Sequence, residues 1–275
     1  VDNNEIIGDG SVIQNQKATI GAGVPLVFMG DCFDAKDISE GKYVESVNEA
    51  IEYFFDISPY KQYRDYFDIY TVIGVSEDSG NISSALGERV SKVGCGYSLK
   101  PDENTVLEYA GEINGLKLEN ATIVLIVNAN LHYGTTYLWG NGTAISCVPI
   151  SSRNYKGIIH HEAGGHGFGK LADESVCFPT FISTDKADEI SVYKSFGFYN
   201  NISLDGDLNS VPWSHLIFDP KYSNIVDVYE GAYEFLRGVF RSETNSCMNN
   251  NVPYYSAISR EAIVNKNAKT AKLFG

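Results

Sequence analysis

Cysteine, methionine and tryptophan are scarce in this sequence. Only two methionines and two tryptophans occur in 275 residues, and no two of the five cysteines form a C-x-x-C pair. This argues against a zinc ribbon, and the odd count in a long chain argues against a dense disulfide framework. We expect the cysteines to be mainly small buried hydrophobic side chains, which leaves room for one or two disulfides. They are Cys32, Cys95, Cys147, Cys177 and Cys247.

Long hydrophobic runs and basic residues are also lacking. The longest apolar stretches, over residues 69–75 and 121–127, are far shorter than the roughly 20 residues that cross a bilayer, so we expect no transmembrane segment. There are 21 basic against 35 acidic residues, a net charge of −14. We expect no nucleic-acid partner, because such binding needs clustered basic side chains. The sequence has no EF-hand loop, so the acidic excess does not indicate a calcium site of that kind.

Short apolar strands alternate with helical patterns. Apolar runs and turn residues predict strands over residues 25–29, 69–76, 121–128, 133–139 and 143–149. Apolar spacings of three and four predict a helix over residues 40–56, and helices are also expected over residues 84–93 and 259–272. Residues 1–24 show little periodicity, which predicts a loop or short hairpin.

This alternation predicts an α/β fold with helices on both faces of a mixed, twisted sheet. A chain of 275 residues is long enough for one large domain. We expect an N-terminal extension over residues 1–24 and one domain over residues 25–275. Its upper lobe would be about 25–172 and its lower lobe about 173–275. The lower lobe is rich in Gly, Asn, Asp and Ser, so we expect it to be irregular apart from its terminal helix.

The segment of residues 154–174 carries three of the five histidines, His160, His161 and His166. A catalytic zinc ion takes three protein ligands and leaves a fourth position for water. In the H-E-x-x-H motif, two histidines bind zinc from one helix face and the glutamate acts as general base. Because Glu162 directly follows His161, we predict a metal site with His161 and His166 as ligands.

The five-residue spacing between His161 and His166 does not fit a regular α-helix. Five steps of about 100° would turn the second side chain roughly 140° away from the first. A π-bulge absorbs one extra residue and often occurs at functional sites. Gly164-Gly165 lies between the two histidines, although each glycine costs about 1 kcal/mol in a helix interior. We therefore hypothesise a π-bulge there; pairing His160 with His166, six residues apart, is a weaker alternative.

The pattern H-E-x-x-x-H-x-x-G-x-x-x-D-E, from His161 to Glu174, looks like a variant of the zincin signature and resembles the IgA-peptidase family of zinc metallopeptidases. Further similar motifs are Gly30-Asp31, P-Y-x-x-Y-R-x-x-F-x-x-Y over residues 59–70, and segments 245–248 and 252–263, so the similarity spans residues 26–264. The resemblance implies a zincin-like fold with an active-site helix, one metallopeptidase catalytic domain over residues 25–275, and Zn²⁺ as cofactor.

The third metal ligand is implied by the same resemblance. In metzincins, which the site resembles, it lies six residues beyond the second histidine, but that position here is Ala172, which cannot bind a metal. Asp173, the next residue, is our candidate. Glu174 and His215 are the alternatives, although we expect His215 to be a buried histidine beside Trp213.

Glu162 is the expected general base, which takes a proton from the attacking water and delivers it to the leaving amine. By resemblance, Met248 forms the Met-turn, a hydrophobic floor beneath the histidines. Tyr254 or Tyr255 is a weaker candidate for holding the oxyanion. An edge strand, over residues 133–139 or 143–149, is expected to pair with an extended substrate.

The motif and the resemblance together predict a zinc-dependent metalloendopeptidase acting on extracellular proteins or glycoproteins. The alternatives are a degenerate zincin that binds protein or glycan without cleaving it, and a metal-dependent amidase or deacetylase. A protein or peptide substrate is the expected partner, and a monomer is favoured. We expect a secreted, cell-surface or periplasmic protein, with Val1 following a signal peptide that has been removed.

Overall fold

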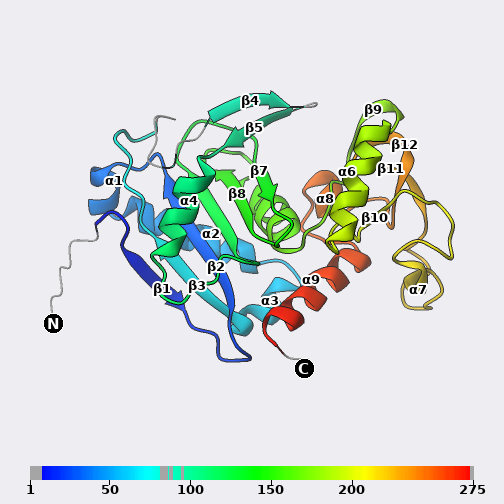
Figure 1. Cartoon of the computed structure of the whole chain (residues 1–275), viewed down its shortest axis with the longest axis horizontal. Helices are drawn as coiled ribbons and strands as arrows, with labels where there is room; N and C mark the ends of the chain where they lie inside the picture. Colours follow the sequence, from blue (N-terminus) through cyan, green and yellow to red (C-terminus); the bar gives the residue numbers. More distant parts are fainter. Residues whose placement is uncertain (1–7, 81–85, 87–88, 94–95, 273–275) are drawn as a thin grey trace.

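The chain is built around a six-stranded sheet in the order β1-β3-β2-β6-β8-β7 (Figure 1). The computed structural model that shows it describes residues 8–80, 86, 89–93 and 96–272. Strands β2, β3, β6 and β8 run parallel, whereas β1 and β7 are antiparallel edge strands. The six strands are β1 (Val12–Gln16), β2 (Val24–Asp31), β3 (Phe67–Val72), β6 (Thr122–Val127), β7 (Thr135–Leu138) and β8 (Ala144–Pro149).

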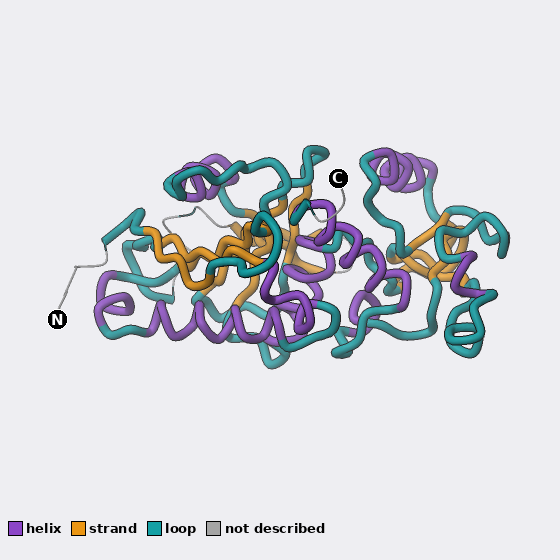
Figure 2. The backbone as a smooth tube through the Cα atoms, turned by 90° about the horizontal axis from the view of Figure 1, so that it is seen from below, coloured by secondary structure: helices purple, strands orange, loops and turns teal. Residues whose placement is uncertain are grey.

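Helices cover both faces of this sheet, as Figure 2 shows from below. Alternate side chains of a strand point to opposite faces, so Leu26 and Phe28 pack on the side of α2 (Lys42–Phe55), which follows the short α1 (Ala35–Ser39). Val27 and Met29 pack on the other side, against α4 (Glu103–Gly111). The short helices α3 (Tyr60–Tyr63) and η1 (Arg64–Tyr66) lead into β3. The predicted α/β fold is confirmed.

The sequence-based predictions located the buried strands and α2 well, but they were wrong about part of residues 84–93. Arg89–Val93 is not helical: it forms strand β4, which pairs antiparallel with β5 (Gly96–Lys100). Two valines flanking a serine and a lysine favour a strand, and the helical pattern there was weak. Residues 84, 85, 87 and 88 lie outside the described residues. Val12–Gln16, in the segment expected to be loop or hairpin, is the edge strand β1.

The C-terminal part is more regular than expected. It contains a second sheet, in which β12 pairs with β9, β10 and β11, and Figure 1 shows this sheet beside α6 and apart from the first. Side chains from this sheet and α6 share one small core, which a reading of local sequence could not detect. The elements are β9 (Val176–Phe181), α6 (Thr184–Ser195), β10 (Ile202–Ser203), α7 (Ser214–Ile217), β11 (Tyr229–Ala232), β12 (Glu234–Arg241), α8 (Cys247–Asn250) and the predicted terminal helix α9 (Ala257–Thr270).

Most of the cysteines that can be described are buried thiols, as predicted. They are Cys32, Cys147 and Cys247, whereas Cys177 is disulfide-bonded; Cys95 lies outside the described residues. Within the described ranges, none of the helices is both long enough and apolar enough to cross a membrane.

Candidate metal centre

The segment that carries the histidines is a π-helix. After β8, a short α-helix, α5 (Tyr155–Ile158), continues directly into η2 (Ile159–Phe168), which is π-helical over ten residues. The Gly169 amide, for example, donates to the Gly164 carbonyl five residues earlier, at 2.9 Å. A helix with this bonding turns less per residue than an α-helix, so side chains five residues apart point in similar directions. The predicted π-bulge is confirmed, and the π geometry extends from Ile159 to Phe168 and so includes both histidines.

Close packing explains the adjacent glycines Gly164 and Gly165 within η2. A Cβ atom on Gly164 would overlap the Tyr255 hydroxyl, and one on Gly165 would overlap the Met248 sulfur, both at well under 3.0 Å. The Tyr255 hydroxyl also donates to the His160 carbonyl, and the Tyr60 hydroxyl donates to the Gly164 carbonyl at 2.6 Å. The glycines therefore let η2 lie directly on the residues that support it.

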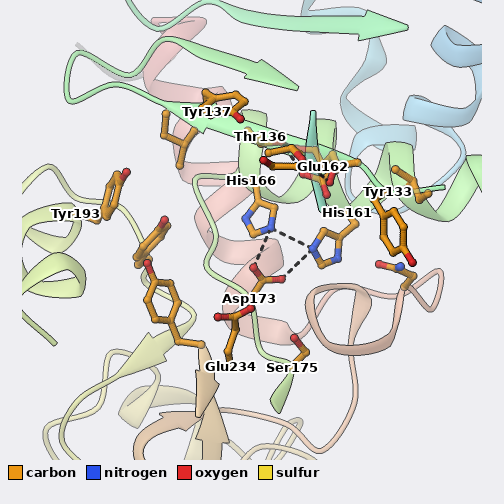
Figure 3. Close-up of a pocket in the computed structure, with 18 of the residues that line it drawn as sticks. Tyr133, Thr136, Tyr137, His161, Glu162, His166, Asp173, Ser175, Tyr193 and Glu234 are labelled. Carbon is orange, nitrogen blue, oxygen red and sulfur yellow. Dashed lines mark hydrogen bonds and ion pairs between the residues drawn. The ribbon is translucent and has the colours of Figure 1, made fainter. Parts of the chain in front are cut away.

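The π-helix and the loop after it bring His161, His166 and Asp173 together, as Figure 3 shows. The two histidine Nε2 atoms are 3.0 Å apart. Asp173 Oδ1 lies 3.0 Å from His161 Nε2, and Oδ2 lies 3.5 Å from His166 Nε2. Tetrahedral ligands held about 2.0–2.1 Å from a zinc ion are roughly 3.3 Å apart. The three donor atoms thus have the spacing of a zinc site.

Backbone carbonyls fix the orientation of both imidazoles. His161 Nδ1 donates to the Cys247 carbonyl at 3.0 Å, and His166 Nδ1 donates to the Leu171 carbonyl at 2.7 Å. Because a carbonyl only accepts, each Nδ1 carries a proton, so in the neutral form of both rings the Nε2 lone pairs face each other. Two lone pairs and a carboxylate directed at one point repel one another unless a cation lies among them. The donor set therefore fits a divalent metal ion.

The charges of the three groups are strongly coupled in the protein alone. Burial lowers the pKa of His161, but the hydrogen bond and charge of Asp173 outweigh it and raise that pKa to about 9. Burial also lowers the pKa of His166, but the charge and hydrogen bond of Asp173 outweigh burial and raise that pKa. Burial raises the pKa of Asp173, yet the charges of the two histidines lower it well below its usual value. Asp173 thus stays ionised, as a metal ligand must be.

The two alternative third ligands lie elsewhere. Glu174 is buried and faces away from the histidines: its carboxylate accepts from Ser246 Oγ at 2.5 Å and from Asn201 Nδ2 at 2.9 Å. His215 is not the buried histidine we expected, because half of its side chain is exposed and its Nε2 pairs with Glu261 at 2.8 Å. It lies at the start of α7, whose single turn leaves the ring in solvent while Trp213 and Leu216 are buried.

His160 is a structural residue. Its ring is buried and Nε2 lies 2.7 Å from the Tyr53 carbonyl of α2. Burial lowers the pKa of His160 to about 4, so the ring is neutral at physiological pH. It faces the core rather than the cleft, which agrees with its low rank as a ligand.

Glu162 lies beside the three donor atoms and is held by the edge strand β7. The Thr136 hydroxyl donates to Glu162 Oε2 at 2.8 Å. At Gly134, just before β7, any Cβ would overlap the Glu162 side chain. The sequence left open whether residues 133–139 or 143–149 form the edge strand. The edge strand is β7, in the first of these segments, and β8 lies inside the sheet. Neither Thr136 nor Gly134 was predicted, since no local motif marks them.

The donor atoms open into a cleft of about 670 Å³, lined by β7, η2 and the loops around the second sheet. Tyr199 and Tyr233 line it, and both have backbone φ in the left-handed region, at 57° and 50°. Bulky residues seldom adopt this conformation, and when they do it is often at functional sites. The predicted oxyanion candidates do not line the cleft: Tyr255 is buried under η2, and Tyr254 donates to Glu243 at 2.8 Å.

Met248 lies where the Met-turn was expected. It is fully buried in α8, with its sulfur packed against Gly165 beneath the histidines. The neighbouring Cys247 carbonyl orients His161, and the Met248 carbonyl accepts from the Glu174 amide at 2.8 Å. This turn therefore supports both the helix and the loop that carries Asp173.

Comparison with known protein families matches this region. The family model described as IgA Peptidase M64 matches residues 13–188, which is more than half of the chain and includes His161, Glu162, His166 and Asp173. A search of curated proteins finds no match.

Proposed function

The chain belongs to the IgA peptidase M64 family of metallopeptidases, and on this premise we propose that it is a zinc-dependent metalloendopeptidase. The observation that carries the proposal is the convergence of two histidine nitrogens and one carboxylate within 4.8 Å of one another, beside a glutamate. His161, His166 and Asp173 would hold the ion. Zinc, when bound, makes a water acidic enough to attack near neutral pH and polarises the carbonyl that is attacked.

Glu162 is the general base in this proposal. It directly follows a proposed ligand in η2, and its carboxylate lies at the cleft. As a carboxylate it accepts a proton from the attacking water, and as a carboxylic acid it delivers that proton to the leaving amine. The hydrogen bond from Thr136 holds one oxygen, Oε2, so that Oε1 is left for this transfer. Thr136 is therefore a positioning residue.

The edge strand β7 supports an extended substrate. It pairs with β8 along one side and is the last strand in the order of the six-stranded sheet, and residues 134–139 line the cleft. An extended peptide that adds to this edge would run past Thr136 and so past Glu162. This mode of binding suits internal bonds of a chain, because neither terminus is needed for recognition. Extracellular proteins or glycoproteins are the proposed substrates, and secretion is part of the proposal.

The two alternative functions, a non-catalytic zincin and an amidase or deacetylase, are less well supported. A degenerate, non-catalytic zincin was suggested by the unusual spacing of His161 and His166, but in a π-helix that spacing returns both rings to one face. An amidase or deacetylase would need no edge strand to align a polypeptide. We therefore argue for the endopeptidase alone.

The variant Glu162→Gln tests the proposal. It removes the base and keeps the size of the side chain, so we expect zinc at one ion per chain and a rate of peptide-bond cleavage lowered by about 10²–10⁴-fold. A denatured protein and a peptide library are the substrates, with zinc content measured on the same samples. Cleavage by the variant at the wild-type rate would overturn the role of Glu162. Cleavage that persists after a chelator has removed the metal would overturn the zinc peptidase.

A further inference from the structure

A second cavity, of about 820 Å³, lies on the other side of η2 from the cleft, where the chain leaves the π-helix. It is bounded by the C-terminal part of α9, by the loops before β2 and after α4, and by the loop after α6. In a chain with a net charge of −14, its lining is rich in lysine. The five are Lys117, Lys170, Lys266, Lys269 and Lys272.

The amino groups of two of these lysines, Lys170 and Lys266, are buried. Lys170 is only 4% exposed, and its ammonium group donates to the Gly167 carbonyl at the end of η2. Lys266 has a buried Nζ atom that donates to no oxygen among the described residues; it lies 4.7 Å from the centre of the Phe168 ring. The amino groups of Lys170 and Lys266 lie within hydrogen-bond reach of each other, and burial and the charge of Lys266 lower the pKa of Lys170.

Simpler roles for these lysines do not account for Lys266. Lysines near the end of a helix offset its negative dipole, which explains Lys269 and Lys272. That effect does not require an amino group to be buried without an oxygen acceptor, which costs free energy. Two carboxylates also line the cavity, but Asp68 already accepts from the Ala18 amide at 2.8 Å, and Glu119 is exposed at the rim.

We propose that this cavity binds an oxyanion group, a phosphate or a sulfate, between Lys170 and Lys266. Such a group accepts several hydrogen bonds at once, so it would accept from the donors of Lys266 and favour protonation of both amino groups. The three exposed lysines at the rim add attraction for a doubly charged anion rather than a single carboxylate. The group can be a free ion or an ester on a sugar, because both forms present terminal oxygens that accept hydrogen bonds.

Isothermal titration of the purified full chain tests the proposal without using peptidase activity. Inorganic sulfate, inorganic phosphate and galactose 6-sulfate are titrated at constant ionic strength, at pH 6.5, because burial lowers the pKa of Lys266 to about 7. Saturable binding of one free ion per chain supports the site. Binding of the sugar sulfate at least tenfold tighter than sulfate supports it with an ester as the ligand. No binding of any of the three at 10 mM overturns it.

Variants show whether the anion occupies this cavity. Lys266→Met is expected to weaken sulfate binding at least tenfold, whereas Lys36→Met, at a side chain that is 74% exposed and outside the cavity, should change it less than twofold. Lys269→Met alters only an exposed rim residue and should weaken binding about threefold, which gives a result even if Lys266→Met folds poorly. Unchanged affinity in Lys269→Met and in folded Lys266→Met would overturn the proposal.

Discussion

The tight contact between η2 and Tyr255 makes Gly164→Ala an informative change. A Cβ atom at Gly164 would overlap the Tyr255 hydroxyl at well under 3.0 Å, whereas the next nearest atoms, Tyr60 Cε2 and Tyr255 Cζ, are 3.1 and 3.5 Å away. Almost all of the conflict is therefore with one oxygen atom. Both tyrosines are fully buried, so neither ring can move aside without disturbing the core.

The expected change in the free energy of unfolding combines the cost of overpacking, the gain from replacing glycine in a helix, and the loss of one hydrogen bond. Overpacking a buried site costs about 1–3 kcal/mol, and replacing glycine by alanine in a helix returns about 0.5–1 kcal/mol. We expect Gly164→Ala to lower the free energy of unfolding by about 1–2 kcal/mol. Tyr255→Phe removes one hydrogen bond, to the His160 carbonyl, at a cost of about 1 kcal/mol. If the two changes were independent, the double variant would lose about 2–3 kcal/mol.

They should not be independent, because Tyr255→Phe deletes the atom that Gly164→Ala meets. We expect the double variant to lose only about 1 kcal/mol, so the two changes should offset each other by at least about 1 kcal/mol. Urea unfolding of the four proteins measures this. The zinc concentration must be the same in all four, since a ligand that binds only the folded state adds to its stability.

Gly111→Ala is the matched control. Gly111 ends α4 and has open space where its Cβ would be, so this variant should be as stable as the wild type or slightly more stable. Additive losses in the double variant, within about 0.5 kcal/mol, would refute the reasoning. They would mean that Gly164 is required for some other reason than its contact with Tyr255.

Three further predictions concern the candidate site. Asp173→Ala should weaken zinc binding by more than about a hundredfold, beyond the 10–100-fold typical of residues that only support a metal ligand, whereas His215→Ala should leave zinc binding unchanged. Zinc content after dialysis measures this, and the reverse result would assign the third ligand to His215. Thr136→Val should keep zinc and KM but lower kcat about tenfold or more, and Thr136→Ser should restore kcat; equal rates in all three proteins would exclude a positioning role. Burial raises the pKa of Glu174 to about 7 from 4.5, so the unfolded state releases its proton first and stability should fall as pH rises from about 4.5 to 7. Glu174→Gln should remove that part of the slope in urea unfolding measured across this range, and an unchanged slope would place the titration elsewhere.

The sequence predicted the buried strands well because their pattern depends on local burial alone. Residues 121–128 are apolar on both faces, and the structure places β6 at Thr122–Val127 in the centre of the sheet. The strand β4 and the second sheet were missed for the opposite reason. Their residues alternate weakly between polar and apolar. In the second sheet, β9 also pairs with β12, which lies more than 50 residues later in the sequence.

The same distinction applies to the candidate site. His161, Glu162 and His166 lie within one helix, so their spacing could be read directly. The groups that orient the histidines are the backbone carbonyls of Leu171 and Cys247, and any residue type supplies a carbonyl. No sequence pattern can mark them. Thr136 comes from an edge strand 26 residues before Glu162 and is equally unmarked.

Asp173 and Glu174 are adjacent carboxylates in the loop after η2. Which of them faces the histidines depends on how the backbone of this loop is hydrogen-bonded to the segments on either side of it. The Asp173 carbonyl accepts from the Tyr233 amide at 3.0 Å, and the Glu174 amide donates to the Met248 carbonyl at 2.8 Å. The loop is thus bonded on both sides as a strand would be, and successive side chains of an extended chain point in opposite directions. Asp173 faces the histidines, so Glu174 must face Ser246 and the buried side. A shift of one residue in this pairing would exchange the two roles, and local sequence alone does not fix that register.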